Sequence, residues 1–338
     1  MTRRVAVVGL GMGALPHLKS LVDLKGRIEV AGAYSRSEER RRACAERFGL
    51  PVTDDLDGLI ADPSISAVVL LTPPNARQEL VERFAGAGKH ILMEKPVERT
   101  RAAAEAIVGT CKGAGVRLGI VLQHRFRRGA EQLKSALAEG VLGDLAAVHL
   151  TVPWWRPQGY YDEPGRGTYA RDGGGVLISQ AIHSMDLMLS LTGPVESVAA
   201  VASTTRLHRM ESEDFVGAGL TFANGAAGAL IVTTAFYPGG AERITLAGTK
   251  GTAVLESGSL ELSFLDGRQE RFGETTATGG GADPMAFPHD WHLALHRDFY
   301  DALDEGREPR ISGAEALQVH RLIDALLQSA REGRTVRV

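Results

Sequence analysis

The sequence has 338 residues, of which 44% are hydrophobic and 23% are charged, and a formal net charge of -3. Chains beyond about 250–300 residues usually divide into more than one core, so two domains are expected. This ordinary globular composition excludes disordered and fibrous proteins. Basic residues are spread along the chain, which argues against a nucleic-acid partner, and no run of about 18 apolar residues predicts a membrane-spanning helix.

The cysteines and the N-terminal segment indicate a cytoplasmic protein. Cys44 and Cys111 lie in helical patterns, and neither has a neighbour at metal-ligand spacing. This usage fits a reducing compartment. Residues 5–15 follow two arginines and superficially resemble a signal peptide, but glycines interrupt the apolar run.

The first 122 residues alternate between short apolar runs and helical patterns. The apolar runs are residues 5–8, 28–34, 67–71, 90–93 and 116–122. Helical patterns between them cover residues 37–47, 75–87 and 100–112. Strands alternating with helices predict a parallel sheet with right-handed crossovers. We therefore expect an α/β, doubly wound Rossmann domain over residues 1–122.

The pattern changes from residue 123 onward. Helices are predicted at residues 129–139 and 175–191, with a strand at 145–152 between them. Further strands are predicted at residues 198–203, 215–222, 228–236, 243–246, 252–256 and 260–264. Successive strands without intervening helices predict an α+β domain over residues 123–338, with a mostly antiparallel sheet and helices on one face.

Two segments near the C-terminus complete this organisation. Residues 273–283 are predicted to form a flexible glycine-rich loop. Amphipathic helices are predicted at residues 290–305 and 313–332, and they could pack back on the first domain.

The first strand runs directly into Gly9-Leu10-Gly11-Met12-Gly13-Ala14, a G-x-G-x-x-A motif. The first glycine permits a tight turn, the second lets the backbone approach a pyrophosphate, and the small third residue allows close packing of helix and strand. A merely structural glycine-rich turn is the alternative. Its place in the first strand-to-helix turn favours dinucleotide binding by Gly9, Gly11, Met12, Gly13 and Ala14.

The second strand ends without the acid that commonly binds the ribose of NAD. Ser35 and Arg36 follow the strand, and Arg40 lies one helical turn further on. Guanidinium groups match a 2′-phosphate, which favours NADP over NAD. The alternative is a solvated helix start whose arginines are offset by Glu38 and Glu39, so both cofactors stay open.

Three further motifs are Thr72-Pro73-Pro74, Glu94-Lys95-Pro96 and the run Gly173-Gly174-Gly175 before a helix that carries His183. Together with the glycine-rich turn, they resemble the Gfo/Idh/MocA oxidoreductase family. The resemblance implies NAD(P)-dependent oxidation or reduction at a carbon of a sugar, cyclitol or related polyol. It also implies a second sheet that serves in a homodimer or homotetramer, and cofactor contacts by Thr72, Pro73, Asn75, Glu94 and Lys95.

The sequence departs from that family's pattern at two positions. Arg77 stands where many members have His, and Ser179 stands where many have Asp or Asn one turn before the histidine. The second departure removes the acidic companion expected for the catalytic residues, and Ser179 could instead orient the substrate or His183.

Lys95 and His183 are the predicted catalytic residues. Hydride transfer needs a neighbouring group that takes or returns the hydroxyl proton. Lys95 follows a strand end, where open α/β sheets bind ligands, although a surface lysine in a turn is the alternative. His183 shares a predicted polar helix stripe with Ser179, Asp186 and Ser190, and we assign the proton transfer to Lys95 and His183 jointly.

Substrate contacts are predicted mainly in the aromatic stretch between residues 154 and 171. Aromatic faces pack on sugar C–H groups and arginines bind hydroxyl or acidic groups, whereas buried anchors or a subunit contact are the alternative. The predicted substrate-binding residues are Lys95, Arg125, Trp155, Arg166, Tyr169, Ser179 and His183. No metal is predicted, because His289, Asp290 and His292 have metal-like spacing but no further ligand near them in sequence.

Two other functions remain open at this point. An NAD-dependent glycoside hydrolase of related fold would use its nicotinamide transiently and regenerate it. A non-catalytic NAD(P)-binding regulator is the third possibility, although the Lys95 and His183 pair argues against it.

Overall fold

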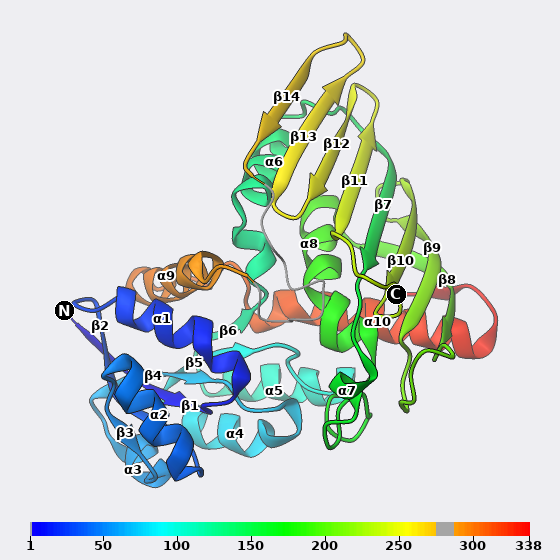
Figure 1. Ribbon diagram of the computed structural model, residues 1–338. Helices are drawn as coiled ribbons and strands as arrows, with labels where there is room; N and C mark the ends of the chain where they lie inside the picture. The colour runs from blue at the N-terminus through cyan, green and yellow to red at the C-terminus, as the bar shows by residue number, and fades with distance from the viewer. Residues whose placement is uncertain (1, 275–286) are drawn as a thin grey trace. The chain divides into compact units, whose positions relative to one another are not determined.

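The computed structural model describes residues 2–274 and 287–338, so the predicted glycine-rich loop lies outside the described residues from position 275 onward. The chain forms two compact units (Figure 1). The first comprises Met1–Leu122 and Pro288–Leu317, and the second comprises Gln123–Phe287 and Gln318–Val338.

The first unit is built on a parallel sheet. Among the described residues it has six strands in the order β3-β2-β1-β4-β5-β6. The strands are β1 (Arg3–Val8), β2 (Ile28–Tyr34), β3 (Val52–Thr53), β4 (Ile65–Leu70), β5 (His90–Glu94) and β6 (Leu118–Val121). Their residues are almost entirely apolar and buried because helices cover both faces of the sheet.

The strand order reverses between β1 and β4, and this fixes where the helices lie. The helices are α1 (Leu15–Asp23), α2 (Glu38–Phe48), α3 (Leu56–Ala61), α4 (Gln78–Gly86), α5 (Arg101–Gly113) and α9 (Asp290–Glu305). Right-handed crossovers place the helices that follow β1 and β4 on opposite faces. α1 packs against α9, and α4 packs against α5 (Figure 1). The doubly wound sheet predicted from the sequence is confirmed.

The second unit is built on a larger sheet. Its described strands follow the order β14-β13-β12-β11-β7-β10-β9-β8-β15. They are β7 (Leu145–Pro153), β8 (Val195–Ser203), β9 (Phe215–Phe222), β10 (Ala227–Thr233), β11 (Arg243–Gly248), β12 (Gly251–Glu256), β13 (Ser259–Phe264), β14 (Gln269–Phe272) and β15 (Val336–Arg337). Only the β7 and β10 neighbours are parallel within this described sheet. The predicted mostly antiparallel sheet is confirmed.

One face of this second sheet packs against helices and the other is open. The helices of the region are α6 (Arg128–Ala138), α7 (Gln158–Tyr161), α8 (Ile182–Thr192) and α10 (Gly313–Glu332), which spans the boundary between the units. α6 contacts β12 and β13, and α8 contacts β7. Strand residues such as Leu150 and Val232 are buried, whereas their neighbours Ala229 and Ile231 are exposed. In the described part of the chain, no helix is long and apolar enough to cross a membrane.

Candidate functional site

The glycine-rich turn lies where the strand order of the first sheet reverses. Gly9 ends β1 with a φ of 106°, and its N–H donates to the Tyr34 carbonyl at 3.0 Å. A Cβ atom on Gly9 would lie 2.9 Å from the carbonyl carbon of Leu71. The end of β1 therefore lies against the segment that follows β4, which is the crevice where open α/β sheets bind ligands.

The rest of the turn leaves space for a pyrophosphate. A Cβ atom on Gly11 or Gly13 would have no neighbouring atom within 4 Å. The 3-10 helix η1 (Met12–Ala14) leads into α1, and no side chain caps the start of either helix. Free N–H groups at a helix start attract phosphate, so Gly11, Met12 and Gly13 fit the pyrophosphate of a dinucleotide. Ala14 is buried, which fits the predicted need for a small residue.

The end of β2 presents two arginines that have no protein partner. Ser35 is buried, and its hydroxyl accepts the Ser37 N–H at 3.2 Å. Arg41 donates to the Ser35 carbonyl at 2.6 Å and thereby holds this turn. The exposed side chains of Arg36 and Arg40 form no hydrogen bond or ion pair with any described residue. Both guanidinium groups are therefore accessible to a phosphate.

Arg77 joins the Thr-Pro-Pro turn to the Lys95-Pro96 turn. Its guanidinium is fully buried and donates to the Thr72 carbonyl at 2.8 and 3.0 Å. It also donates to the carbonyl of Pro96. Burial lowers the pKa of Arg77 to about 10, against the opposing effect of Glu94 and Glu98, so the group stays charged at neutral pH. Arg77 therefore connects the two turns by hydrogen bonds, a role that its sequence position did not reveal.

Thr72, Pro73 and Asn75 lie along the turn that follows β4. Pro73 and Asn75 are exposed, and the hydroxyl of Thr72 is buried without a hydrogen-bond partner among the described residues. This placement at the carboxyl end of the sheet is compatible with their predicted cofactor contacts.

Glu94 anchors the backbone of Lys95. One carboxylate oxygen accepts the Lys95 N–H at 3.0 Å, and the other lies 3.0 Å from Nε2 of His17. Burial alone would raise the pKa of Glu94, but the hydrogen bond and charge of His17, together with Lys95, lower it overall. Lys95 itself is half-buried, and its peptide bond to Pro96 is cis. A charged Glu94 therefore holds the predicted catalytic lysine at the end of β5.

In the second unit, Glu213 organises the glycine run before His183. The Val176 N–H donates to the Glu213 carbonyl at 2.8 Å, and the N–H groups of Gly175 and Leu177 donate to its carboxylate at 3.2 Å. A Cβ atom on Gly175 would lie 1.8 Å from the Glu213 carbonyl oxygen, so only glycine fits. Burial raises the pKa of Glu213. No local pattern indicates this contact, because 38 residues separate Gly175 from Glu213.

The prediction of one regular α-helix over residues 175–191 was wrong in its first part. Residues Leu177–Ala181 form a π-helix, and α8 begins only at Ile182. The extra residue in that turn changes which side chains share a face, and such turns are frequent at functional sites. Ser179 donates to the Gly175 carbonyl at 2.5 Å and also contacts Gln180.

His183 stacks on a second histidine, and Asp186 binds an arginine. The rings of His183 and His124 lie 4.9 Å apart between centroids, with an angle of 28° between planes. Arg125 makes two buried hydrogen bonds with Asp186, at 2.5 and 2.7 Å. These two hydrogen bonds of the Arg125 guanidinium thus fix α8 to the segment after β6.

The aromatic stretch divides into buried anchors and more exposed groups. Trp154, Arg156 and Tyr161 are buried, and Arg156 lies over the ring of Trp154. Arg166 lies 4.5 Å above the Tyr160 ring, and the Tyr160 hydroxyl accepts from Gln180 at 3.3 Å.

The alternative of buried anchors thus describes part of this stretch, and substrate contact by its more exposed side chains stays a prediction. Trp155 is half-buried against Tyr237, and Tyr169 is 48% exposed. Tyr160 was not singled out in the sequence, although it connects the stretch to the segment carrying Ser179.

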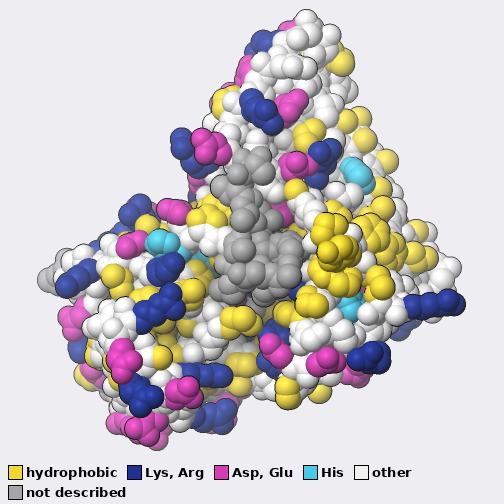
Figure 2. All heavy atoms as spheres, viewed as in Figure 1, with side chains coloured by type: hydrophobic (Ala, Val, Ile, Leu, Met, Phe, Trp, Pro, Cys, Tyr) yellow, Lys and Arg dark blue, Asp and Glu magenta, His cyan; other side chains and the backbone are white. Residues whose placement is uncertain are grey.

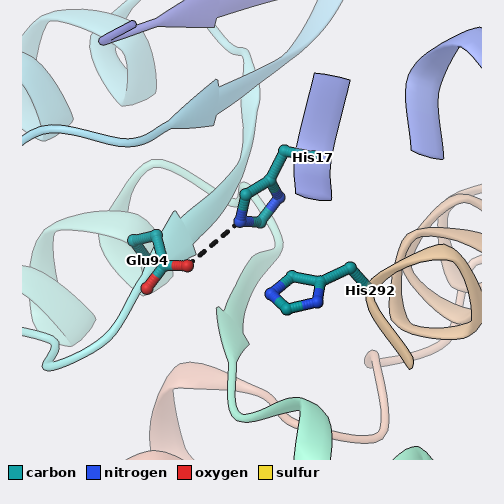
Figure 3. Close-up of side chains that lie close together, drawn as sticks. All are labelled: His17, Glu94 and His292. Atoms are coloured by element: carbon teal, nitrogen blue, oxygen red, sulfur yellow. Dashed lines mark hydrogen bonds and ion pairs between the residues drawn. The ribbon is translucent and has the colours of Figure 1, made fainter. Parts of the chain in front are cut away.

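His289 and His292, which are close in sequence, have different partners. His289 pairs with Asp23 at 2.8 Å. His292 lies instead beside His17 and Glu94, and potential ligand atoms of these three side chains lie within 4.8 Å of one another (Figure 3). The partners come from α1, β5 and α9, which explains why local spacing could not reveal the cluster.

Comparisons with known proteins agree with this architecture. Residues 3–121 match the family described as "Oxidoreductase family, NAD-binding Rossmann fold". Residues 130–254 match the "GFO/IDH/MocA C-terminal domain". The first match covers the strands of the first sheet, and the second covers most strands of the second sheet.

Individual relatives cover nearly the whole chain. D-apiose dehydrogenase of Rhizobium rhizogenes is 26% identical, over 98% of this chain and 96% of that protein. The scyllo-inositol 2-dehydrogenase (NADP(+)) of Bacillus subtilis is 24% identical, over 99% of this chain and 96% of the other. The WlbA dehydrogenase from Bordetella pertussis, solved with NADH and UDP-GlcNAcA, is 30% identical, covers 100% of this chain and 99% of that one, and superposes with a TM-score of 0.85.

Proposed function

The chain belongs to the Gfo/Idh/MocA family of NAD-binding oxidoreductases, and we propose that it transfers a hydride between NAD(P) and a carbon of a sugar, cyclitol or sugar derivative. The carrying observation is the open space above Gly11 and Gly13 at the start of α1, in the crevice that Lys95 also borders. Residues 1–122 hold the cofactor in this proposal, and residues 123–338 supply the substrate contacts.

The proposed cofactor is NADP, with NAD as the alternative. Arg36 and Arg40 have no described protein partner, so their charges are accessible to a 2′-phosphate. Relatives point both ways, because the Bacillus subtilis enzyme is named for NADP and the Bordetella pertussis enzyme was solved with NADH. The accessible arginines are the observation that supports NADP in this proposal.

Lys95 and His183 share the proton transfer in the proposed mechanism. When bound, the nicotinamide supplies the hydride acceptor or donor. Lys95 donates a hydrogen bond to the substrate oxygen and stabilises the charge that develops there. Lys95 and His183 together take the hydroxyl proton when the substrate is oxidised and return it when the product is reduced. Glu94 and Arg77 fix the turn on which Lys95 stands.

Substrate contacts are assigned to side chains of the second unit. Trp155 and Tyr169 offer aromatic surface for sugar C–H groups, and Arg166 offers hydrogen-bond donors. Ser179 orients the substrate hydroxyl in place of the expected acid. Arg125 contributes mainly by holding Asp186, and through it α8.

The open face of the second sheet is proposed to bind another copy of the chain. Adjacent strands present small or apolar residues on this face, with Ala229 opposite Gly219 and Ile231 opposite Gly217. On β8, the strand that flanks β9 on its other edge, Val201 is 66% exposed and lies opposite Gly217. Hydrophobic side chains gather over this part of the second unit in Figure 2. A flat apolar sheet face of this kind is typical of an oligomer interface, as in a homodimer or homotetramer.

A substrate screen tests the proposed function. Purified protein is mixed with NAD or NADP and with polyols, free sugars and nucleotide sugars, and nicotinamide absorbance is followed. Reduction of NADP by a compound of this class supports the proposal. Release of sugar from a glycoside, with no net absorbance change, would instead indicate a glycoside hydrolase, and binding of cofactor without any turnover would indicate a regulator.

A further inference from the structure

A cluster of buried imidazoles surrounds Glu94 on one face of the first sheet. His17 and His292 are 0% and 2% exposed, and they reach the carboxylate from α1 and α9 (Figure 3). Their rings meet edge to face, with centroids 4.9 Å apart. Two imidazoles and one carboxylate, withdrawn from water and directed at a common point, are a donor set for a divalent metal ion.

A second layer of hydrogen bonds orients these donors. Nδ1 of His17 lies 2.9 Å from Nε2 of His296, which is itself fully buried. The Glu94 carboxylate oxygen that does not contact His17 accepts the Lys95 N–H. Metal-binding histidines and carboxylates usually have such outer partners, which fix the ring tautomer and the direction of the ligand.

We propose that His17, Glu94 and His292 bind a divalent transition-metal ion such as Zn²⁺. Metal–ligand bonds of about 2.0–2.2 Å allow ligand atoms to lie up to about 4.4 Å apart. The potential ligand atoms lie within 4.8 Å of one another, so small side-chain movements complete the coordination. Imidazole ligands favour zinc, nickel or copper over magnesium and calcium, which prefer oxygen.

The ion would join three separate parts of the first unit. It would connect α1, the end of β5 and α9, and it would hold the carboxylate that anchors Lys95. The site does not depend on the proposed hydride transfer, because its ligands are defined by their own geometry. It also differs from the local set His289, Asp290 and His292, from which no metal site was predicted.

Metal content of the untagged, full-length protein tests the proposal. Bound metal is removed with a chelator, and the protein is equilibrated with Zn²⁺ at pH 7.5. Unbound zinc is then removed by desalting, and bound zinc is measured by inductively coupled plasma mass spectrometry. We expect about one zinc ion per chain, and at least about tenfold weaker binding in His17→Asn and His292→Asn. His289→Asn is the matched control, because it removes a histidine adjacent to the same helix that lies outside the cluster.

Two results would overturn the site: wild-type protein that retains no zinc, or His292→Asn that binds zinc as tightly as His289→Asn. If a ligand variant fails to fold, Co²⁺ is added to the wild-type protein instead. Visible absorption bands of Co²⁺ in a nitrogen and oxygen site support the proposal, and the spectrum of hydrated Co²⁺ overturns it. These measurements do not involve turnover, so their outcome is separable from that of the substrate screen.

Discussion

Substitution of the first motif glycines by alanine separates folding from cofactor binding. At Gly9 the added methyl group meets the Leu71 carbonyl carbon at 2.9 Å, on a backbone whose φ is 106°. The unfavourable backbone costs about 1–2 kcal/mol and the overpacking about 1–3 kcal/mol, so Gly9→Ala should lower the free energy of unfolding by about 2–5 kcal/mol. At Gly11 the methyl group meets no atom, and φ is -81°.

Gly11→Ala should therefore fold as well as the wild type and yet bind NADP at least about tenfold more weakly, because the methyl group occupies the space assigned to the pyrophosphate. Urea unfolding followed by circular dichroism gives the stabilities, and titration calorimetry gives the affinities. Gly86→Ala in α4, where the added methyl group also meets no atom within 4 Å, is the control that should retain both properties. Unchanged NADP affinity in Gly11→Ala would refute the assignment of the turn, and wild-type stability in Gly9→Ala would refute the steric argument.

Four further outcomes are expected. Arg36→Ala should weaken NADP far more than NAD in equilibrium titrations, and an equal loss for both would exclude the 2′-phosphate contact. Arg77→Met should lower the free energy of unfolding by about 1.5–3 kcal/mol, because buried carbonyls lose a charged donor; urea unfolding with exposed Arg42→Met as control checks this. Burial raises the pKa of Cys111 to about 12, so its protonated thiol should resist alkylation at pH 8 in the native protein and react in urea, as read by mass spectrometry; rapid native labelling would contradict this. Ile231→Asp should reduce the oligomer mass in light scattering, and an unchanged mass would exclude that sheet face.

The layers of the fold could be predicted because buried strands and helices leave local patterns of apolar and polar residues in the sequence. Continuous apolar runs indicated the parallel strands, and turn residues between short alternating runs indicated the antiparallel ones. The predicted strand at residues 215–222 has the same limits as β9. The short strands β14 and β15 were not predicted, since a few residues carry too little pattern.

The chemistry of the site was less accessible because it depends on contacts between distant residues. His17 and His296 are 279 positions apart in sequence, and Glu213 reaches the glycine run from the segment that precedes β9. The π-helix at Leu177–Ala181 inserts a residue that a periodicity of 3.6 cannot reveal. Arg77 was noticed only as a departure from a pattern, and its role follows from the carbonyls that surround it.

The central claim is hydride transfer assisted by Lys95 and His183, and an isotope measurement tests it most directly. A polyol found in the screen is prepared with deuterium on its reacting carbon, and the reduced nicotinamide is analysed by mass spectrometry. We expect deuterium on the nicotinamide, and Lys95→Ala and His183→Ala should each slow this transfer strongly while cofactor affinity stays within several-fold. A nicotinamide without deuterium, or unimpaired transfer in both variants, would contradict it.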